Sequence, residues 1–297
     1  MKIHNLVFLL MVLRASATLH AQQSRGPDKK LSYLFTDIGK EVLVAAHRGD
    51  WRNAPENSVQ GLENCIVMGV DITEFDLKRT KDGRLIILHD NTFDRSSTGK
   101  GRPEDYTWEE IKRFQLRSGI GHPTRHRIPS FTEMLLAARG KIIVDIDKGY
   151  EYYDEVIREL QQQKMLGQSI LNIYGMSFDS VRSMHDHIPE ELVLQVIINA
   201  DNPDMERIID SYKAHPRTII QVIFSTDTAL TKCPIECIRW YNALWPEQNG
   251  GHDDDRAVEE NSPDETWGWL VSRKAAVIQT DRPRELMNYL RRKGLHE

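Results

Sequence analysis

Residues 71–90 read DITEFDLKRTKDGRLIILHD, and this stretch decides how the chain folds. Two strand-like runs, 71–77 and 84–89, are joined by a short connector that ends in Asp82-Gly83, a tight-turn signal. A crossover between parallel strands needs a dozen or more residues, so the second run must return antiparallel to the first. We therefore predict a β-hairpin arm after the second strand.

Short β-branched runs alternate with helical patterns along the rest of the chain, which predicts repeated βα units around a parallel sheet. Once the hairpin arm is set aside, eight candidate strands remain, the number that closes a barrel. The expected fold class is therefore α/β, a single-domain (β/α)8 TIM barrel. The candidate strands, with the arm included, lie near 42–46, 71–77, 84–89, 141–147, 170–175, 192–198, 219–224, 237–243 and 275–280. The candidate helices lie near 58–69, 107–116, 131–139, 151–166, 178–187, 203–213, 256–273 and 283–293.

The composition is that of a globular protein. The chain has 297 residues, of which 40% are hydrophobic and 28% charged. This length fits one barrel domain, since such barrels run to about 250 residues. The net charge of -5 provides no basic field for nucleic acid or for an anionic membrane. We expect a small-molecule partner, no nucleic acid and no stable membrane insertion, and the sequence leaves the oligomeric state open.

The first residues have the pattern of a secretory signal peptide. A positive residue precedes an apolar run over residues 6–13, and small residues that could end the signal follow at Ala17 and Ala21. The run is too short to span a bilayer, which takes about 20 apolar residues. We expect a signal peptide over residues 1–21, a barrel domain over residues 22–297, and an exported protein, periplasmic or secreted.

Chemistry-bearing residues gather in one short part of the chain. The first strand-like run leads into His47 and Arg48, and the hairpin arm ends in His89. Glu74 and Asp76 lie on one face of the second run, because strand side chains alternate. Two histidines can exchange protons near neutral pH, an arginine can hold a phosphate, and two neighbouring carboxylates favour a hard cation. This combination indicates a metal-dependent phosphodiester site.

The same segment resembles the glycerophosphodiester phosphodiesterase family, within the phosphatidylinositol phospholipase C-like phosphodiesterase superfamily. The family pattern His-Arg-Gly, Pro-Glu-Asn-Thr, Glu-x-Asp, Thr-x-Asp-Gly, His-Asp is met here with Ser58 in place of one threonine. Residues 128–131 and 279–283 resemble later family landmarks. The resemblance implies a TIM barrel and a phosphoric diester hydrolase that converts glycerophosphodiesters to an alcohol and glycerol phosphate. His47 and His89 are the expected catalytic acid and base.

The resemblance also implies a divalent cation, with Glu74 and Asp76 as ligands. The family usually places a glutamate two residues before a lysine at the next strand end. Here Asp147 occupies the position of the glutamate, and Lys148 is displaced by one residue. Asp145 shares a strand face with Asp147 and competes for the role, but we predict Asp147 as the third ligand and Asp145 as a supporting group. An all-oxygen ligand set favours Mg²⁺ or Ca²⁺ over zinc and does not choose between those two.

Four further residues are expected to assist. Arg48 and Lys148 should bind the substrate phosphate, and the planar fork of an arginine suits phosphate oxygens. Glu56 and Asn57 should support the metal site or His47 from behind. Asn57 could also cap the helix that follows it.

Other residues are weaker candidates. The mouth of the site could be lined by Trp51, Arg95, Lys100 and Trp245, and late strand ends place Gln221 and Asn242 near it. The acidic run 253–255 is interpreted as a solvated turn rather than a second cation site, because no calcium-loop spacing follows it.

Two other functions fit the same residues. A phospholipase C or D-like lyase of this barrel type would attack an intact lipid, but no strongly amphipathic basic segment is present to meet a membrane. A non-catalytic, metal-dependent phosphodiester-binding protein would keep the barrel, and the displaced Lys148 is its support. His47 and His89 favour the hydrolase, since a binding protein has little use for paired proton carriers.

Overall fold

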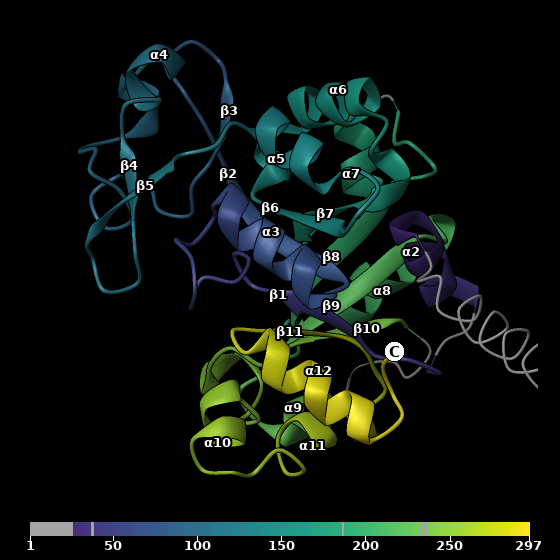
Figure 1. Ribbon diagram of the computed structural model, residues 1–297. Helices are drawn as coiled ribbons and strands as arrows, with labels where there is room; N and C mark the ends of the chain where they lie inside the picture. Colours follow the sequence, from purple (N-terminus) through teal and green to yellow (C-terminus); the bar gives the residue numbers. More distant parts are fainter. Residues whose placement is uncertain (1–25, 37–38, 186, 232, 234–236) are drawn as a thin grey trace, which may run out of the picture.

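The computed structural model describes residues 26–297 apart from 37–38, 186, 232 and 234–236. It consists of a barrel surrounded by helices, with a separate lobe at one side (Figure 1). The expected signal peptide lies outside the described residues, so that part of the sequence analysis stays a prediction. Among the helices that are described, none is long and apolar enough to cross a membrane.

Eight parallel strands close into the barrel. They are β1 (Leu43–Ala46), β2 (Ile72–Arg79), β6 (Ile143–Asp147), β7 (Ser169–Tyr174), β8 (Val193–Asn199), β9 (Thr218–Ile223), β10 (Arg239–Asn242) and β11 (Ala275–Thr280). Neighbours pair in the order β1-β11-β10-β9-β8-β7-β6-β2, and the pairing of β1 with β2 closes the ring. Each of these strands lies within a few residues of its predicted position, so the predicted TIM barrel is confirmed.

The end of β2 and β3 (Leu85–Ile87) form the predicted hairpin arm. The two strands pair antiparallel, with Leu77 opposite Ile87. Gly83 closes the turn at φ +81°, a left-handed conformation that glycine adopts without steric cost. The arm carries His89 to the carboxyl end of the barrel, where it lines the same cavity as the ends of β2 and β6.

Helices cover the outside of the barrel. They are α2 (Pro27–Thr36), α3 (Val59–Met68), α4 (Trp108–Ile111), α5 (Phe131–Ala138), α6 (Tyr153–Gln163), α7 (Phe178–Met184), α8 (Met205–Ser211), α9 (Asp227–Leu230), α10 (Asp254–Val258), α11 (Trp267–Ser272) and α12 (Pro283–Arg292). The sequence did not predict α2, and the single helix expected over 256–273 is two helices, α10 and α11. Ser58, not Asn57, caps α3, because Asn57 has a left-handed φ of +56° that a cap does not adopt.

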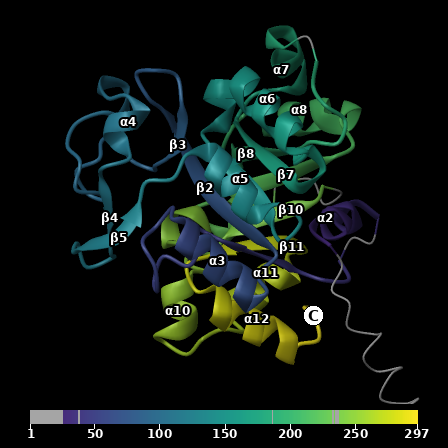
Figure 2. The same cartoon turned by 45° about the horizontal axis from the view of Figure 1, so that its top comes forward.

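Residues 91–130 form the lobe beside the barrel. It contains α4 and a two-stranded sheet of β4 (Gln115–Arg117) and β5 (Pro123–Arg127). The helix predicted over 107–116 was wrong in its second half, because the chain leaves the helix so that Leu116 can pack into a small core of the lobe's own. Figures 1 and 2 show the lobe standing to one side of the helical layer in both views.

The interior of the barrel changes from apolar to polar along its axis. Ile72, Ile143 and Ile170 fill the amino-terminal end with fully buried side chains, and Leu31 and Leu34 of α2 pack against them from below. Further along the same strands the inward-facing positions become polar. Polar groups therefore meet at the carboxyl end, where barrels of this kind carry their functional sites.

Gly49 is expected to tolerate no side chain. It has a φ of +74°, and a Cβ there would lie 3.0 Å from the backbone carbon of Gly61 in α3. Gly83 has a similar φ, but nothing lies within 4 Å of the position of its Cβ. We expect Gly49→Ala to lower the free energy of unfolding by about 2–4 kcal/mol and Gly83→Ala by about 1 kcal/mol in urea denaturation. Equal losses would show that backbone strain alone sets both costs.

Candidate active site

A polar cavity of about 230 Å³ opens at the carboxyl ends of the strands. Its walls come from the strand ends and from the loops that follow β1, β3, β6 and β10. The polar residues that line it are His47, Arg48, Glu74, Asp76, His89, Asp147, Lys148, Asn172, Tyr174, Gln221, Asn242, Gln248 and Gln279. Both predicted catalytic histidines and all three predicted metal ligands therefore face one cavity.

Three carboxylates converge in this cavity. Glu74 and Asp76 on β2 lie beside β6, where Asp147 is in register with Asp76. One oxygen from each of the three residues lies within 4.8 Å of the others. This spacing and the all-oxygen donor set fit a hard divalent cation, with Glu74, Asp76 and Asp147 as its protein ligands.

Asp145 does not belong to this carboxylate cluster. It lies two residues before Asp147 on β6, in register with Glu74, and its side chain is fully buried beside Asn172. Burial, followed by the charge of Asp147, raises the pKa of Asp145 well above its usual value. The geometry therefore favours Asp147 over Asp145 as the third ligand and places Asp145 beneath the cluster.

Lys148 reaches the cavity from an uncommon backbone conformation. Its φ of +59° is left-handed, and the side chain turns toward the cavity although it follows Asp147 directly. Its Nζ donates to Asp76 Oδ1 at 2.7 Å and to the backbone oxygen of His89 at 3.0 Å. The backbone thus compensates for the displacement of this lysine along the sequence.

The charges in the carboxylate cluster are unevenly balanced. Burial raises the pKa of Glu74, and the neighbouring charges of Asp76 and Asp147 raise it further. Burial acts in the same direction on Asp76, but nearby cationic groups, above all Lys148, outweigh it and lower the pKa of Asp76 to about 2. A bound cation would favour the charged form of all three carboxylates.

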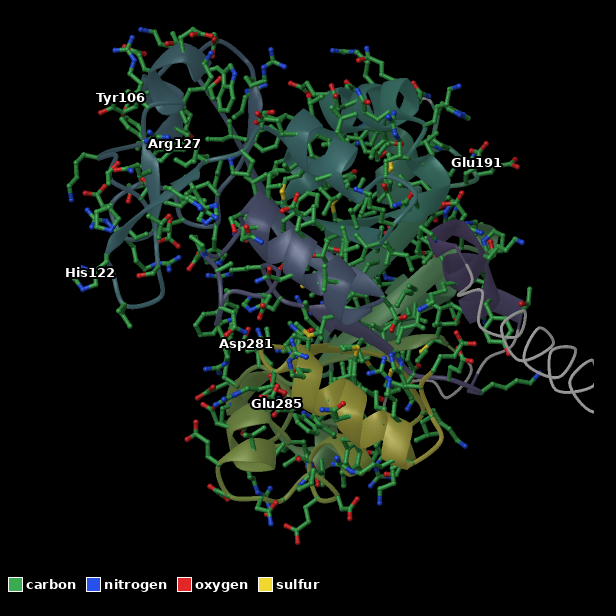
Figure 3. The ribbon with its side chains drawn as sticks, in the orientation of Figure 1. Tyr106, His122, Arg127, Glu191, Asp281 and Glu285 are labelled. Carbon is green, nitrogen blue, oxygen red and sulfur yellow. The ribbon has the colours of Figure 1, made fainter. Side chains whose placement is uncertain are left out.

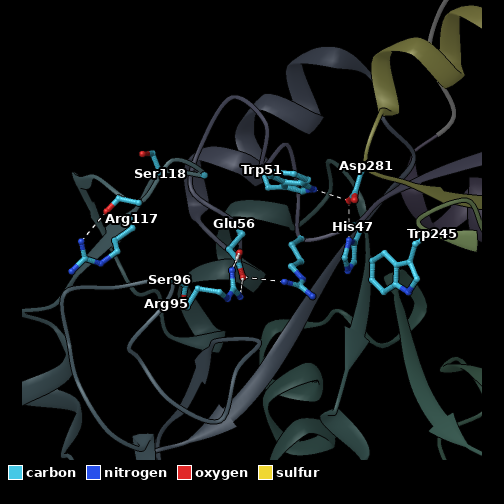
Figure 4. Close-up of a pocket in the computed structure, with 12 residues that line it drawn as sticks. His47, Trp51, Glu56, Arg95, Ser96, Arg117, Ser118, Trp245 and Asp281 are labelled. Atoms are coloured by element: carbon cyan, nitrogen blue, oxygen red, sulfur yellow. Dashed lines mark hydrogen bonds and ion pairs between the residues drawn. The ribbon is translucent and has the colours of Figure 1, made fainter. Parts of the chain in front are cut away.

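A carboxylate from near the other end of the chain holds His47. The Nδ1 of His47 lies 2.9 Å from Asp281 Oδ1, which also accepts a 2.6 Å hydrogen bond from the Trp51 indole N–H (Figure 4). Burial works to raise the pKa of Asp281, but the hydrogen bond and charge of His47, together with the Trp51 hydrogen bond and the charge of Arg52, outweigh it and lower the pKa. The sequence marked Asp281 only as part of a family landmark, because its contact with His47 depends on β11 lying beside β1.

Asp254 fixes the backbone on which Asp281 sits. Its Oδ2 accepts hydrogen bonds from the backbone N–H of Asp281 at 2.6 Å and from the Thr280 hydroxyl at 2.9 Å. Its Oδ1 accepts a 2.9 Å bond from the Trp267 indole. Burial raises the pKa of Asp254 to about 8. The interpretation of 253–255 as a solvated turn was therefore wrong for its first two residues. Asp253 is buried and caps α10, and Asp254 packs inward against the end of β11.

His89 has a carboxylate partner of its own. Its Nδ1 lies 2.7 Å from Asp90 Oδ1, and Arg95 donates to Asp90 Oδ2 at 2.7 Å. Arg95 also donates to Glu56 Oε1 at 2.7 Å, and Arg48 donates to the same oxygen at 3.2 Å. Glu56 is therefore tied to two arginines and lies outside the carboxylate cluster. Burial lowers the pKa of His89.

Three neighbouring groups hold the carboxylate cluster in place. Asn57 Nδ2 donates to Asp76 Oδ2 at 2.9 Å, and the backbone N–H of Arg48 donates to Glu74 Oε2 at 2.8 Å. The Tyr174 hydroxyl donates to Asp147. The sequence did not reveal Tyr174, because an aromatic residue at a strand end carries no signal until β7 lies beside β6.

Aromatic and basic side chains line the mouth of the site. Trp51, Arg95 and Trp245 do so as expected. Lys100 instead pairs with Asp94 at 3.2 Å on the exposed surface of the lobe, so its predicted place at the mouth was wrong. The two late-strand candidates, Gln221 and Asn242, line the cavity itself.

Two family models match the chain. One is described as the glycerophosphoryl diester phosphodiesterase family and matches residues 47–187. The chain belongs to this family. The other is described as a domain of unknown function and matches residues 195–290. The first match contains both histidines and the carboxylate cluster, and the second contains Asp254 and Asp281, so the two matched segments build one site.

Curated relatives carry the same family name. A glycerophosphodiester phosphodiesterase from Caldanaerobacter subterraneus subsp. tengcongensis is 29% identical over 185 residues, which are 59% of this chain and 76% of the relative. A glycerophosphodiester phosphodiesterase from Bacillus subtilis is 27% identical over 175 residues, 52% of this chain and 59% of the relative. The chain thus spans less than two thirds of the length of the Bacillus relative.

Solved structures of glycerophosphodiester phosphodiesterases share the barrel. A glycerophosphoryl diester phosphodiesterase from Parabacteroides distasonis has a TM-score of 0.73 at 21% identity, and the likeness covers 91% of this chain and 93% of that one. A phosphodiesterase from Oleispira antarctica, solved in complex with the product sn-glycerol-3-phosphate, has a TM-score of 0.62 at 15% identity and covers 84% and 97%. At these identities the likeness supports the fold.

The carboxylate cluster should bind a divalent cation through Asp147. We expect Asp147→Asn to weaken Mg²⁺ or Ca²⁺ binding by about 100-fold, because one of three charged ligands is lost. Asp145→Asn makes the same chemical change two residues earlier and should keep the affinity within about fivefold. Isothermal titration calorimetry measures both. The opposite order of effects would make Asp145 the third ligand.

Proposed function

We propose that the protein is a metal-dependent phosphoric diester hydrolase that converts glycerophosphodiesters to an alcohol and glycerol phosphate. One observation carries this proposal: His47 and His89, each held by its own carboxylate, face the cavity in which three carboxylates converge. Two oriented proton carriers beside a cation site suit the hydrolysis of a phosphodiester. The names of the curated relatives support the same activity.

His47 is the general base in this proposal. With its Nδ1–H donating to Asp281, the Nε2 of His47 carries the free lone pair that takes the proton. The side chain of Asp281 is otherwise hydrogen-bonded to the neutral indole of Trp51, so its negative charge is available to stabilise the imidazolium. The proton comes from the attacking hydroxyl, which is either a water or the glycerol 2-hydroxyl of the substrate. Attack by the 2-hydroxyl releases the alcohol and forms a cyclic phosphate, which a water then opens to glycerol phosphate.

His89 is the general acid. Its partner Asp90 shares its charge with Arg95 at 2.7 Å, which weakens the stabilisation that Asp90 gives to the imidazolium of His89. Burial also lowers the pKa of His89. Both effects make protonated His89 a ready donor to the departing alkoxide, which leaves poorly without a proton.

A divalent cation, Mg²⁺ or Ca²⁺, would be held by Glu74, Asp76 and Asp147 and would supply neutralising charge at a phosphate oxygen. Arg48 and Lys148 add two positive charges at the same cavity and are the proposed phosphate-binding residues.

The supporting residues act through the side chains that they orient. Asn57 orients Asp76, and Glu56 orients Arg48. Asp145 lies beneath the cluster.

The binding-protein alternative loses the observation that supported it. Its argument was the displacement of Lys148, but the Nζ of this residue reaches Asp76 and the cavity. No feature of the described residues favours a lyase acting on intact lipid over hydrolysis of a soluble diester.

The cellular setting is a proposal from the sequence. The signal-like pattern over residues 1–21 supports export to the periplasm or the medium. A soluble glycerophosphodiester, the deacylated remainder of a phospholipid, fits that setting. Fractionation of the producing cells would test it, and a purely cytoplasmic protein with an intact N-terminus would contradict it.

Removal of either histidine should abolish most of the hydrolysis. We expect His47→Ala and His89→Ala each to lower kcat on glycerophosphodiesters by about 10²–10⁴-fold, because each removes one proton transfer. EDTA should have a comparable effect that added Mg²⁺ or Ca²⁺ reverses. Release of glycerol phosphate measures the rate. Activity that survives both EDTA and His47→Ala would exclude the mechanism.

Asp281 should affect the rate of hydrolysis only through its contact with His47. We expect Asp281→Asn to lower kcat by about 10–100-fold with little change in KM, because the imidazolium of His47 loses its carboxylate. Asp255→Asn is the matched control, since that carboxylate is exposed and pairs with Arg282 rather than with a histidine. A loss in both variants, or a fall in melting temperature that accounts for the loss, would argue for a structural role.

A further inference from the structure

A second cavity, of about 360 Å³, adjoins the catalytic one and lies between the barrel and the lobe. The two cavities share His47, Arg48 and Trp245. In Figure 4, His47 and Trp245 stand on the barrel side, and Arg117 and Ser118 stand on the opposite side, on the lobe. A diester whose phosphate lies in the catalytic cavity would therefore extend one of its alcohol groups into this space.

Arg117 is the cation of this second cavity that has no carboxylate partner among the residues the structure describes. Its Nε donates to the backbone oxygen of Ser97 at 2.7 Å and its Nη1 to that of Gly121 at 2.8 Å. The other two arginines in the wall, Arg48 and Arg95, are both paired with Glu56. Two carbonyl contacts hold the Arg117 guanidinium in place without neutralising it, which leaves its charge for a ligand.

Two serine hydroxyls flank Arg117. The Oγ atoms of Ser96 and Ser118 are buried and have no hydrogen-bond partner in the described part of the chain. Ser96 is 6% exposed, its backbone oxygen accepts from the backbone N–H of Arg117 at 2.8 Å, and Ser118 follows Arg117 directly. A buried hydroxyl without a partner costs free energy, and rotation about χ1 can turn each one toward a ligand in the cavity.

The surroundings of Arg117 add to the positive potential. Residues 112–127, which include β4 and β5, contain five Lys or Arg and no Asp or Glu. Figure 3 shows His122 and Arg127 on the lobe that carries this hairpin. A cluster of one sign of charge beside a cavity raises the local concentration of ligands of the opposite sign.

We propose that this second cavity binds an acidic substituent, a carboxylate or a second phosphate, on an alcohol group of the substrate. Arg117 pairs with the acidic group, and the hydroxyls of Ser96 and Ser118 donate to its remaining oxygens. Trp51 and Trp245 provide apolar surface for the carbon skeleton between the two anionic centres. The inference rests on the proposed function, since it names the class of diester that the same site prefers.

Glycerophosphoserine and glycerophosphoethanolamine test this preference, because they differ only by one carboxylate. We expect kcat/KM for the serine diester to be about tenfold higher, the effect of one charge-assisted contact at a partly exposed site. Arg117→Gln should bring the ratio of the two values close to one, and the double change Ser96→Ala, Ser118→Ala should lower it in part. Arg125→Gln, an exposed change on β5 outside the cavity, is the matched control: it removes one charge from the same hairpin and should lower the ratio far less than Arg117→Gln does.

Equal kcat/KM values for the two diesters, or a ratio that survives Arg117→Gln, would overturn the inference while the proposed hydrolase stands. If neither diester is hydrolysed, the proposed function fails instead. The cavity is then tested by calorimetric binding of both diesters to His89→Ala in the presence of Mg²⁺. About tenfold tighter binding of the serine diester, lost in the Arg117→Gln background, supports the inference, and equal binding contradicts it.

Discussion

The crowding of acids at the ends of β2 and β6 is the constraint on which the site depends. Parallel pairing puts Glu74 beside Asp145 and Asp76 beside Asp147, in an interior largely closed to water. Carboxylates in such a space repel one another unless donors and cations offset their charge. Lys148 supplies one such cation, from a left-handed backbone. That conformation carries strain of about 1–2 kcal/mol, which the ion pair with Asp76 helps to offset.

Closure of the barrel brings residues that are far apart in the sequence into one site. The pairing of β1 with β11 places His47 next to Asp281, and Asp254 holds the backbone of Asp281 from behind. The segment matched to a domain of unknown function thus has a physical role, since it supplies the groups that orient a histidine from the other matched segment. Because Asp254 belongs to α10, the packing of this helix and the position of the His47 side chain are linked through Asp281.

The lobe gives the site a second wall that a bare barrel lacks. Its own apolar core holds the hairpin of β4 and β5 beside the barrel mouth, with Arg117 and Ser118 in the wall of the second cavity opposite Trp245. Two kinds of arginine result. Arg48 and Arg95 are ion-paired with Glu56, whereas Arg117 has no carboxylate partner among the described residues, so its charge is open to an anionic group other than the phosphate that Arg48 is proposed to bind.

The sequence by itself determined the eight-stranded barrel, the hairpin arm after β2 and the shared face of Glu74 and Asp76. These features follow from side-chain alternation, connector length and turn chemistry, which act over a few residues. Only the tertiary structure decided that Asp147 rather than Asp145 joins the carboxylate cluster and that Asp254 is buried. It also decided that Asp281, 234 residues from His47, is its partner. Those contacts depend on the register of strands and helices that meet when the barrel closes, and no local pattern encodes that register.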